Sequence, residues 1–447
     1  MKHDVVVLGG GLAGLSAARD LAAGGADVVV LGARNRPGGR VEQTTLADGR
    51  LVQLGGEVVG PHQRAYYGLV EELGLTLVPA FPDLPGEETW VLAHRREVGD
   101  GHPWMSEADR ETYVRLDREF AELAAGVDPE DPWSHPDAAA LDRLSVGDWL
   151  RDRGAGPDVV RARDLAMLAL SAESVERTSL LSDLRKEAAA GAPGFYSYDV
   201  WECERVAEGS ATVALRMAEE LGPRIRYATP VTRVKVAGSG SVVTTATGER
   251  FESEAVVCAI PVGPLRRIAI EGVSDERRAS LDRQRHALAV KVVFAYESSF
   301  WEEQGQNGDA YWETGVLGGT WVQREGIISA LVPPERLAAF LATSPEQIER
   351  EMVEEMAQAF GERARAPLGV FFRRWAVDPW TEGYITSWRP GDVMAVGPLH
   401  GTHEPPFYVC GSDQWVCGYM EGAVRTGRGA ARAALSRAGP APPGSPR

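Results

Sequence analysis

The chain has 447 residues, 44% of them hydrophobic, so it can bury a large core and is predicted to form two domains. The 64 acidic residues outnumber the 47 basic ones, and the formal net charge of −17 argues against nucleic-acid binding, because phosphate contacts need clustered lysine and arginine. An apolar strand begins at Val5, no run is long enough to span a membrane, and the four cysteines lack zinc-type spacing. These features predict a cytoplasmic protein without a leader, a membrane segment or a disulfide framework.

Residues 4–31 predict a strand, a glycine turn, a helix and a second strand. The turn fits the pattern G-x-G-x-x-G directly after a strand and at the start of a helix, as a dinucleotide-binding unit requires. Gly9 permits the tight turn, Gly11 lets backbone amides approach a pyrophosphate at the positive end of the helix, and Gly14 lets helix and strand pack closely. A nucleotide-binding βαβ unit is therefore predicted at the N-terminus.

The residue after the second strand departs from this pattern. An acid is expected there to bind the ribose hydroxyls of the adenosine, and Gly32 occupies the position. Two alternatives remain open at this point. The cofactor is NADP, with its 2′-phosphate accepted by Arg34 or Arg36, or it is FAD, with one ribose contact absent or replaced by water.

Residues 33–40, Ala-Arg-Asn-Arg-Pro-Gly-Gly-Arg, form a second glycine turn that ends in an arginine suited to a second phosphate contact. This segment resembles the flavin-containing amine oxidase family, which includes monoamine, polyamine and L-amino acid oxidases. The family pattern is an acid followed by Ala-Arg-x-Arg-x-Gly-Gly-Arg, and only the acid is missing here. The resemblance implies FAD rather than NADP, with contacts from Arg34, Gly38, Gly39 and Arg40.

Two later segments are similar to further parts of the family pattern. Residues 54–61 resemble the Gly-Gly segment that approaches the flavin, which implies cofactor contacts from Gly55 and Gly56. Residues 208–261 resemble the second nucleotide-contacting stretch, in which Val231 would meet the adenine through its backbone.

Lys291 lies in the apolar run of residues 287–294, where a lysine calls for an explanation. One explanation is that Lys291 lies on a strand with one face exposed to solvent. The other is a partly desolvated lysine with a lowered pKa that hydrogen-bonds, directly or through water, near the flavin N5. The family places a lysine with this role in a similar setting, so Lys291 is a candidate catalytic residue.

Two tyrosines complete the set of candidate catalytic residues. Residues 380–386 resemble the segment in which monoamine oxidases carry a flavin-linking cysteine, and Tyr384 at that position implies non-covalent FAD. Those enzymes flank the amine with two tyrosines. Tyr419 matches one of them and Ile385 stands at the other, so the cage is incomplete unless Tyr384 or Trp388 supplies the second wall.

The C-terminal segments at 407–413 and 418–424 resemble the family's Gly-Thr-Glu segment and the start of its last helix. Asp413 stands where the family usually has glutamate. A helix beginning near Gly422 would direct its amides at the electron-rich pyrimidine edge of the flavin. The resemblance implies cofactor contacts from Gly411, Asp413, Gly418 and Met420.

No metal site is expected. His400, His403 and Glu404 lie close together in the sequence, but a pair of loop histidines without a third placed ligand is far more often solvated.

The fold class predicted from these segments is α/β, with a discontinuous Rossmann-like FAD-binding domain and an inserted α+β substrate domain. Residues 80–200 are predicted to be largely helical, with helices at 107–125 and 158–190; further helices are predicted at 210–221 and 345–360. The FAD-binding domain comprises residues 1–78, 204–285 and 375–438, the substrate domain 79–203 and 286–374, and a disordered tail 439–447.

The resemblance implies an oxidoreductase that removes a hydride from the carbon beside a substrate nitrogen to flavin N5. The imine product hydrolyses, and O2 reoxidises the flavin to give hydrogen peroxide. The expected partners are a small-molecule amine or amino acid and O2, together with a second copy of the chain in a homodimer.

Three other functions remain open. An L-amino acid oxidase would need an arginine for the substrate carboxylate, and Arg64 or Arg389 could serve. A biosynthetic flavin dehydrogenase or desaturase would react slowly with O2. A flavin-binding scaffold whose catalysis has decayed would explain Gly32, Asp413 and Ile385. Residues 55–60 are closer to the amine-specific branch, so amines rank first.

Overall fold

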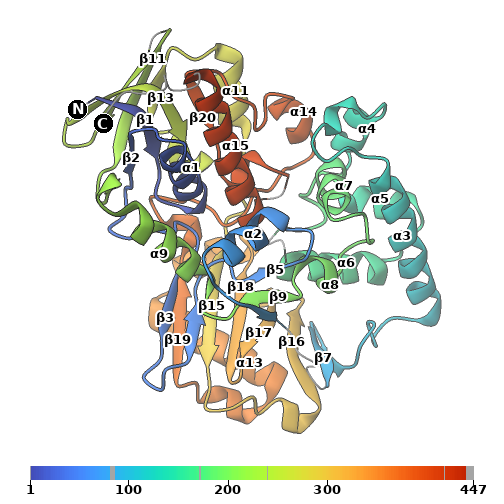
Figure 1. Ribbon diagram of the computed structural model, residues 1–447. Helices are drawn as coiled ribbons and strands as arrows, with labels where there is room; N and C mark the ends of the chain where they lie inside the picture. The colour runs from blue at the N-terminus through green and yellow to red at the C-terminus, as the bar shows by residue number, and fades with distance from the viewer. Residues whose placement is uncertain (1, 81–85, 171–172, 239, 417, 439–447) are drawn as a thin grey trace.

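The computed structural model describes residues 2–80, 86–170, 173–238, 240–416 and 418–438, so the predicted tail lies outside the described residues. Two large β-sheets organise the chain, one above the other in Figure 1. The first sheet has the strand order β10-β2-β1-β13-β12-β11-β14, and β20 also pairs with β13. Its strands are β1 Lys2–Leu8, β2 Val28–Leu31, β10 Ile225–Arg226, β11 Val231–Ala237, β12 Gly240–Thr245, β13 Arg250–Cys258, β14 Ala269–Glu271 and β20 Phe407–Val409.

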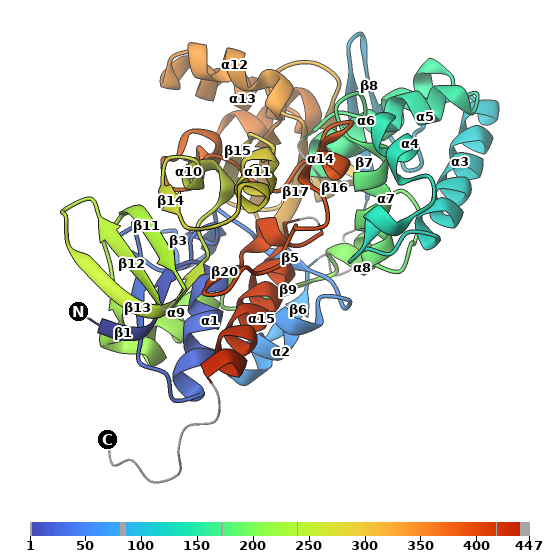
Figure 2. The ribbon, with the colours of Figure 1, turned by 90° about the horizontal axis from the view of Figure 1, so that it is seen from above.

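The N-terminal βαβ unit forms as the glycine pattern predicts. Strand β1 pairs in parallel with β2 and β13, and helix α1 (Leu12–Ala23) connects β1 to β2. Helix α15 (Met420–Ala438) lies beside α1, and α2 (Arg64–Glu72) lies beside α15, as Figure 2 shows. A side chain at Gly427 would overlap the Ala13 carbonyl, so α1 and α15 approach closely where the glycine turn ends.

The second large sheet has the order β19-β15-β18-β17-β16-β7-β8. Strands β15 and β18, which follow the edge strand β19 in this order, are buried along their full lengths, and helices α12 and α13 pack against the sheet. The prediction of a largely helical region over 80–200 missed β7 and β8, which extend this sheet through pairing between β7 and β16. The bounds are β7 Glu87–Leu92, β8 Arg95–Val98, β15 Val290–Ala295, β16 Gln306–Trp312, β17 Gly319–Arg324, β18 Ile327–Val332, β19 Gly369–Arg373, α12 Pro334–Ala342 and α13 Pro345–Phe360.

A helical region with its own core lies at the side of the molecule opposite the β11–β12 hairpin in both views (Figures 1 and 2). The single predicted helix at 158–190 is two helices, because Ser179 starts the second one by accepting a hydrogen bond from the Ser182 amide. The helices are α3 Glu107–Ala125, α4 Ala138–Arg143, α5 Val146–Asp152, α6 Pro157–Leu170 and α7 Leu180–Ala189.

Short elements join the large ones. Strands β3 and β4 form a hairpin, and β5, β9 and β6 form a three-stranded sheet in that order. Both are separate from the two large sheets. The bounds are β3 Gln43–Thr45, β4 Leu51–Gln53, β5 Val58–Val59, β6 Leu77–Pro79, β9 Glu204–Val206, α8 Tyr198–Trp201, α9 Ser210–Leu221, α10 Val262–Leu265, α11 Asp275–Arg283 and α14 Asp392–Val396. None of the helices described is both long and apolar enough to cross a membrane.

The close approach at Gly14 gives a test of the βαβ unit. A methyl group at this position would overlap the Gly9 carbonyl oxygen, so Gly14→Ala is expected to destabilise the fold by roughly 1–3 kcal/mol and to lower the FAD content. Thermal unfolding and the visible absorbance of the purified protein measure both effects. Gly68→Ala is the control: Gly68 lies inside α2 with open space at its Cβ position, and the substitution should stabilise by about 0.5 kcal/mol. Equal melting temperatures for the two variants would contradict this packing.

Candidate active site

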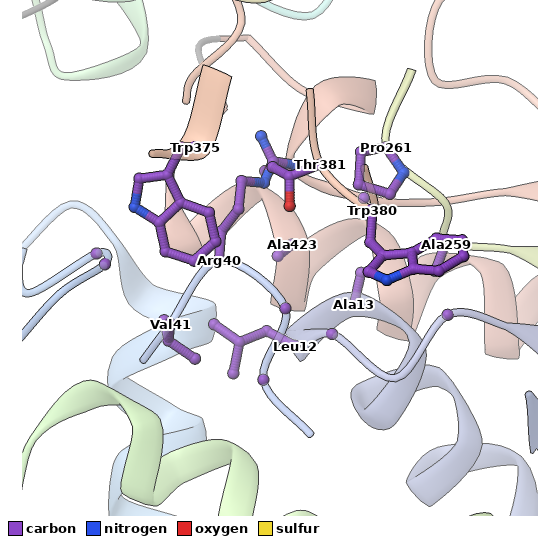
Figure 3. A pocket seen from close by; sticks show the side chains of 18 of the residues that line it. Leu12, Ala13, Arg40, Val41, Ala259, Pro261, Trp375, Trp380, Thr381 and Ala423 are labelled. Atoms are coloured by element: carbon purple, nitrogen blue, oxygen red, sulfur yellow. The ribbon is translucent and has the colours of Figure 1, made fainter. Parts of the chain in front are cut away.

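One cavity extends from the glycine turn after β1 to the central strands of the second sheet. It is lined by residues from both large sheets and from the start of α15. Figure 3 shows the nucleotide end, with Leu12 and Ala13 at the start of α1 and with Trp375 and Trp380 on opposite sides of Arg40. The lining includes these predicted site residues: Gly9, Gly11, Arg34, Gly38, Gly39, Arg40, Gly55, Gly56, Val231, Lys291, Tyr384, Gly411, Gly418, Tyr419 and Met420.

The first turn of α1 faces this cavity with free backbone amides. Gly11 caps the helix without a side-chain hydrogen bond, and no acidic residue lies in the first turn. Gly9 has a φ of +106°, which favours glycine, and the second glycine turn lies against the first because the Gly38 amide donates to the Gly10 carbonyl at 2.8 Å. Unpaired amides at a helix N-terminus bind phosphate, so this end fits the diphosphate of FAD.

Both arginines considered for a 2′-phosphate are bound to acids of the chain. The Arg34 guanidinium donates to both oxygens of Asp378, at 2.9 and 2.5 Å, and to Thr381. Arg36 donates to Glu42 and to backbone carbonyls. The NADP alternative therefore has no free guanidinium at these two positions. Arg34 was predicted as a cofactor contact; it lines the cavity, with its charge paired to Asp378.

Asp413 holds Arg40 in place. Its Oδ1 accepts from Arg40 Nη2 at 2.6 Å, and its Oδ2 lies 2.8 Å from His286 Nε2. Burial raises the pKa of Asp413, but Arg40 and His286 outweigh burial and hold that pKa below its usual range. Arg40 also donates to the Ser412 hydroxyl and the Tyr384 carbonyl. Asp413 was predicted as a cofactor contact; the lining instead contains its neighbour Ser412 and its partner Arg40.

Lys291 is fully buried on β15, the strand next to the edge strand β19 of the second sheet. Every residue of β15 is buried, so the explanation of a strand with a wet face is wrong. Its Nζ donates to the Gly55 carbonyl at 2.9 Å and to the Glu57 carboxylate, and it lies 5.2 Å from the centroid of the Trp321 ring. Burial lowers the pKa of Lys291, while Glu57 acts against the shift.

Glu57 is a residue of the cavity that the sequence interpretation did not assign. Besides Lys291, it accepts hydrogen bonds from Trp321 Nε1 at 2.6 Å and Gln323 Nε2 at 2.9 Å. These donors satisfy the carboxylate of a side chain that is only 4% exposed. The only signal in the sequence was that Glu57 lies in the Gly-Gly segment and Lys291 in an apolar run. Because the two are far apart in the chain, the sequence did not indicate that they pair.

Aromatic side chains surround the end of the cavity near Lys291. Tyr384 and Tyr419 both line it, and the Tyr419 ring lies 5.0 Å from the Trp201 ring. Trp388, considered as a second wall, packs instead in the core of the helical region. Trp321 lines the cavity and supplies an aromatic face that the sequence interpretation missed.

The last helix begins earlier than predicted. Helix α15 starts at Met420, two residues before Gly422, and Gly418 precedes it with a φ of +82°. Glu421 lies in the first turn, but its carboxylate accepts from the Tyr66 amide at 2.8 Å in α2. The acid is thereby paired with α2, and Met420 lines the cavity at the N-terminal end of the helix.

His400 and Glu404 have other partners in the structure, and the His403 ring packs against the Tyr408 ring. His400 Nε2 lies 2.8 Å from the Asp413 carbonyl oxygen, and Glu404 accepts from Ser274. Among the residues that the structure describes, no group of three or more histidine, cysteine or acidic side chains is arranged for a metal ion.

The cavity and its lining agree with the comparisons with known proteins. The model of the family described as flavin containing amine oxidoreductase matches residues 12–435. The chain belongs to this family. The curated putrescine oxidase of Kocuria rosea is 29% identical over 465 aligned residues, covering 97% of this chain and 95% of that protein. The L-amino acid dehydrogenase of Synechocystis sp. is 26% identical, covering 97% and 94%.

A solved structure of wild-type putrescine oxidase bound to putrescine matches with a TM-score of 0.90 and 28% identity, over 98% of this chain and 100% of that one. Membership of the flavin amine oxidoreductase family confirms the predicted FAD-dependent oxidoreductase and its α/β fold. Tyr384 has no thiol with which to link the flavin, and the FAD is held by non-covalent contacts.

Gly32 gives a test of how the flavin amine oxidoreductase holds the ribose. The atom nearest to a Cβ at Gly32 would be the Arg226 carbonyl oxygen at 3.7 Å, an ordinary contact, so a longer side chain fits beside the cavity. We expect Gly32→Glu to slow FAD release from the holoprotein by roughly tenfold, because a carboxylate would accept hydrogen bonds from the ribose. Flavin fluorescence after dilution measures the release.

Gly32→Met is the matched control, since methionine is similar in length but offers no carboxylate. If Gly32→Glu released FAD as fast as Gly32→Met or as the original protein, the ribose would not lie at this position.

Proposed function

We propose that this flavin amine oxidoreductase oxidises the carbon–nitrogen bond of a small amine to an imine, with O2 as the electron acceptor and hydrogen peroxide as a product. The observation that carries the proposal is a single cavity that joins the amides of α1 to the buried Lys291 and the aromatic side chains Tyr384, Tyr419 and Trp321. When bound, FAD would supply the hydride-accepting chemistry that amino acid side chains lack.

The residues of the chain have separate roles in this proposal. The amides of α1 and the turn at Gly38 bind the FAD diphosphate. The Arg40 side chain, which is held by Asp413, lines the cavity between its nucleotide end and its reacting end. The aromatic side chains orient the neutral amine and exclude water from the reacting carbon. Lys291 Nζ places a positive charge and a hydrogen-bond donor at the reacting end, where it orients a water molecule or favours the reduction of O2.

The charges at the reacting end favour an amine over an amino acid. A substrate carboxylate would need an unpaired arginine, and neither Arg64 nor Arg389 is among the residues that line the cavity. The cation at this end is Lys291, which is already paired with Glu57. The lining arginines are Arg34, Arg36, Arg40 and Arg267, and each is paired with an acid of the chain. The acceptor O2, the cytoplasmic location and the homodimer stay predictions.

A panel of substrates tests the reaction. The purified holoprotein is mixed without O2 with alkylamines, diamines and L-amino acids, and flavin bleaching is recorded before and after admission of O2. We expect bleaching by amines rather than by L-amino acids, rapid recovery in O2, and formation of hydrogen peroxide. Bleaching by L-amino acids alone would contradict the amine assignment. Slow recovery would indicate a dehydrogenase, and no bleaching by any compound would indicate a decayed scaffold.

Lys291→Met tests the role of the lysine. We expect the rate of reoxidation by O2 to fall about 100-fold, the loss typical of removing one preorganised charged donor from an active site. Stopped-flow absorbance measures the reductive and oxidative half-reactions separately. If both rates were unchanged, Lys291 would have no part in the reaction.

Two control variants accompany this measurement. Lys235→Met removes an exposed lysine of β11 and should leave both half-reactions unchanged. Lys291→Met leaves Glu57 buried without its partner, so the double variant with Glu57→Gln separates stability from chemistry. The double variant should recover thermal stability while reoxidation stays slow.

A further inference from the structure

Tyr419, one of the aromatic side chains of the cavity, packs against a second aromatic ring. Trp201, at the end of α8, is buried, and its ring centroid lies 5.0 Å from that of Tyr419. Among the described residues that line the cavity, Tyr419 is present and Trp201 is not. Trp201 therefore lies behind the cavity wall, where it can influence a ligand only through Tyr419.

Other side chains enclose Trp201. The Tyr196 ring lies 6.2 Å away at an interplanar angle of 9°, and the His62 ring lies 4.3 Å away with its plane nearly perpendicular. Ala189 and Ala190, at the C-terminal end of α7, pack against the same cluster. Because the indole is packed on several sides, a change in its orientation moves the rings beside it.

One hydrogen bond fixes the polar edge of this indole. Trp201 Nε1 donates to Glu187 Oε2 at 3.0 Å, and Glu187 is a residue of α7 with no solvent exposure. The N–H group is the single donor of a tryptophan side chain, and burial makes a donor without an acceptor unfavourable. Loss of the Glu187 carboxylate would therefore free the indole from its present orientation.

Glu187 stays buried because cations lie beside it. Lys186 Nζ is 3.2 Å from Glu187 Oε1 and 3.3 Å from Asp183 Oδ1, and Arg163 Nη2 is 2.8 Å from Asp183 Oδ2. Burial raises the pKa of Glu187 to about 7, and Lys186 acts against this rise. Above that pH the carboxylate is charged, and a charged acceptor strengthens the hydrogen bond from Trp201.

We propose that Glu187 is a positioning residue of the active site, which fixes the Tyr419 ring through Trp201 and thereby the orientation of the amine. The inference rests on the proposed amine oxidation and adds to it a residue outside the cavity. In the part of the chain that the structure describes, Glu187 does not line the cavity, so it acts without touching substrate or flavin. If the Tyr419 ring turns, the reacting carbon is presented less precisely, which lowers the rate of hydride transfer more than the affinity for the amine.

The test measures flavin reduction by an amine without O2, at a pH above the pKa of Glu187. We expect Glu187→Leu to lower the limiting reduction rate about tenfold and to change the apparent Kd of the amine by less than about threefold. Glu187→Gln keeps an acceptor oxygen for Trp201, so its rate should stay within about threefold of the original.

Asp183→Asn is the matched control. It removes a charge from the same group of ion pairs on α7 but leaves the acceptor of Trp201 in place. It should lower the melting temperature without changing the reduction rate. A rate that fell as far as in Glu187→Leu would overturn the proposal, and so would equal rates for Glu187→Gln and Glu187→Leu.

A second variant avoids any change to the buried charges. Trp201→Phe removes the N–H donor and leaves Glu187 paired with Lys186. We expect it to lower the reduction rate about as much as Glu187→Leu, and the double variant to be no slower than either single variant. An unchanged rate in Trp201→Phe, or losses that multiply in the double variant, would overturn the proposal.

A measurement without turnover separates this inference from the proposed function. In protein labelled with fluorotyrosine, the fluorine NMR resonance of Tyr419 is identified by its loss in Tyr419→Phe. Glu187→Leu should shift that resonance, because the neighbouring Trp201 ring changes its orientation. If no amine reduced the flavin but the shift occurred, the proposed function would fail and positioning by Glu187 would stand. A resonance that did not move would overturn the positioning.

Discussion

The arrangement of the active site depends on the buried ion pair between Lys291 and Glu57. Lys291 belongs to the buried strand β15 of the second sheet, whereas Glu57 follows the glycine segment that lines the cofactor cavity. Either charge alone would cost several kcal/mol to bury, so the two segments are held in one relative position. Trp321 and Gln323 satisfy the remaining capacity of the carboxylate. The pair thus fixes the lysine beside the glycine segment of residues 55 and 56, which lines the same cavity.

The charged groups that line the cavity differ between its two ends. At the nucleotide end, Arg34, Arg36 and Arg40 are paired with acids of the chain, and free backbone amides remain for the diphosphate. At the reacting end, Lys291 and Glu57 neutralise one another, and the Glu202 side chain also lines the cavity. An anionic diphosphate is therefore favoured at the nucleotide end, and the neutralised pair at the other end suits a neutral amine. Because the arginines at the nucleotide end are already paired with acids, they do not attract a substrate carboxylate.

The features that the sequence predicts well are those with local causes. The turn from Gly9 to Gly14 needs glycine at specific backbone positions, so its pattern alone indicated the βαβ unit and the nucleotide end of the cavity. Lys291 was identifiable because a charge within an apolar run is unusual. The resemblance to a family then supplied positions such as Tyr384 and Tyr419, which no periodicity would have marked.

The features that the sequence did not predict depend on contacts between distant segments. Glu57 is 234 residues from Lys291, and no local pattern pairs them. Asp413 matched a motif for cofactor contact, but the structure turns its carboxylate to Arg40, since burial makes that pairing necessary. Glu202 lies in no motif, and only the structure shows that it lines the cavity. The strands β7 and β8 were missed because their pairing partner β16 is far along the chain.

If the proposed function is correct, FAD lies in this cavity with its reactive ring edge at Lys291, and a crystal structure of the FAD-bound protein would show this. We expect the diphosphate at the amides of α1, the adenine beside Val231, and Lys291 Nζ within hydrogen-bonding distance of the ring or of one bridging water. A flavin ring on the far side of Tyr419, or a ring edge separated from Lys291 by protein side chains, would contradict it.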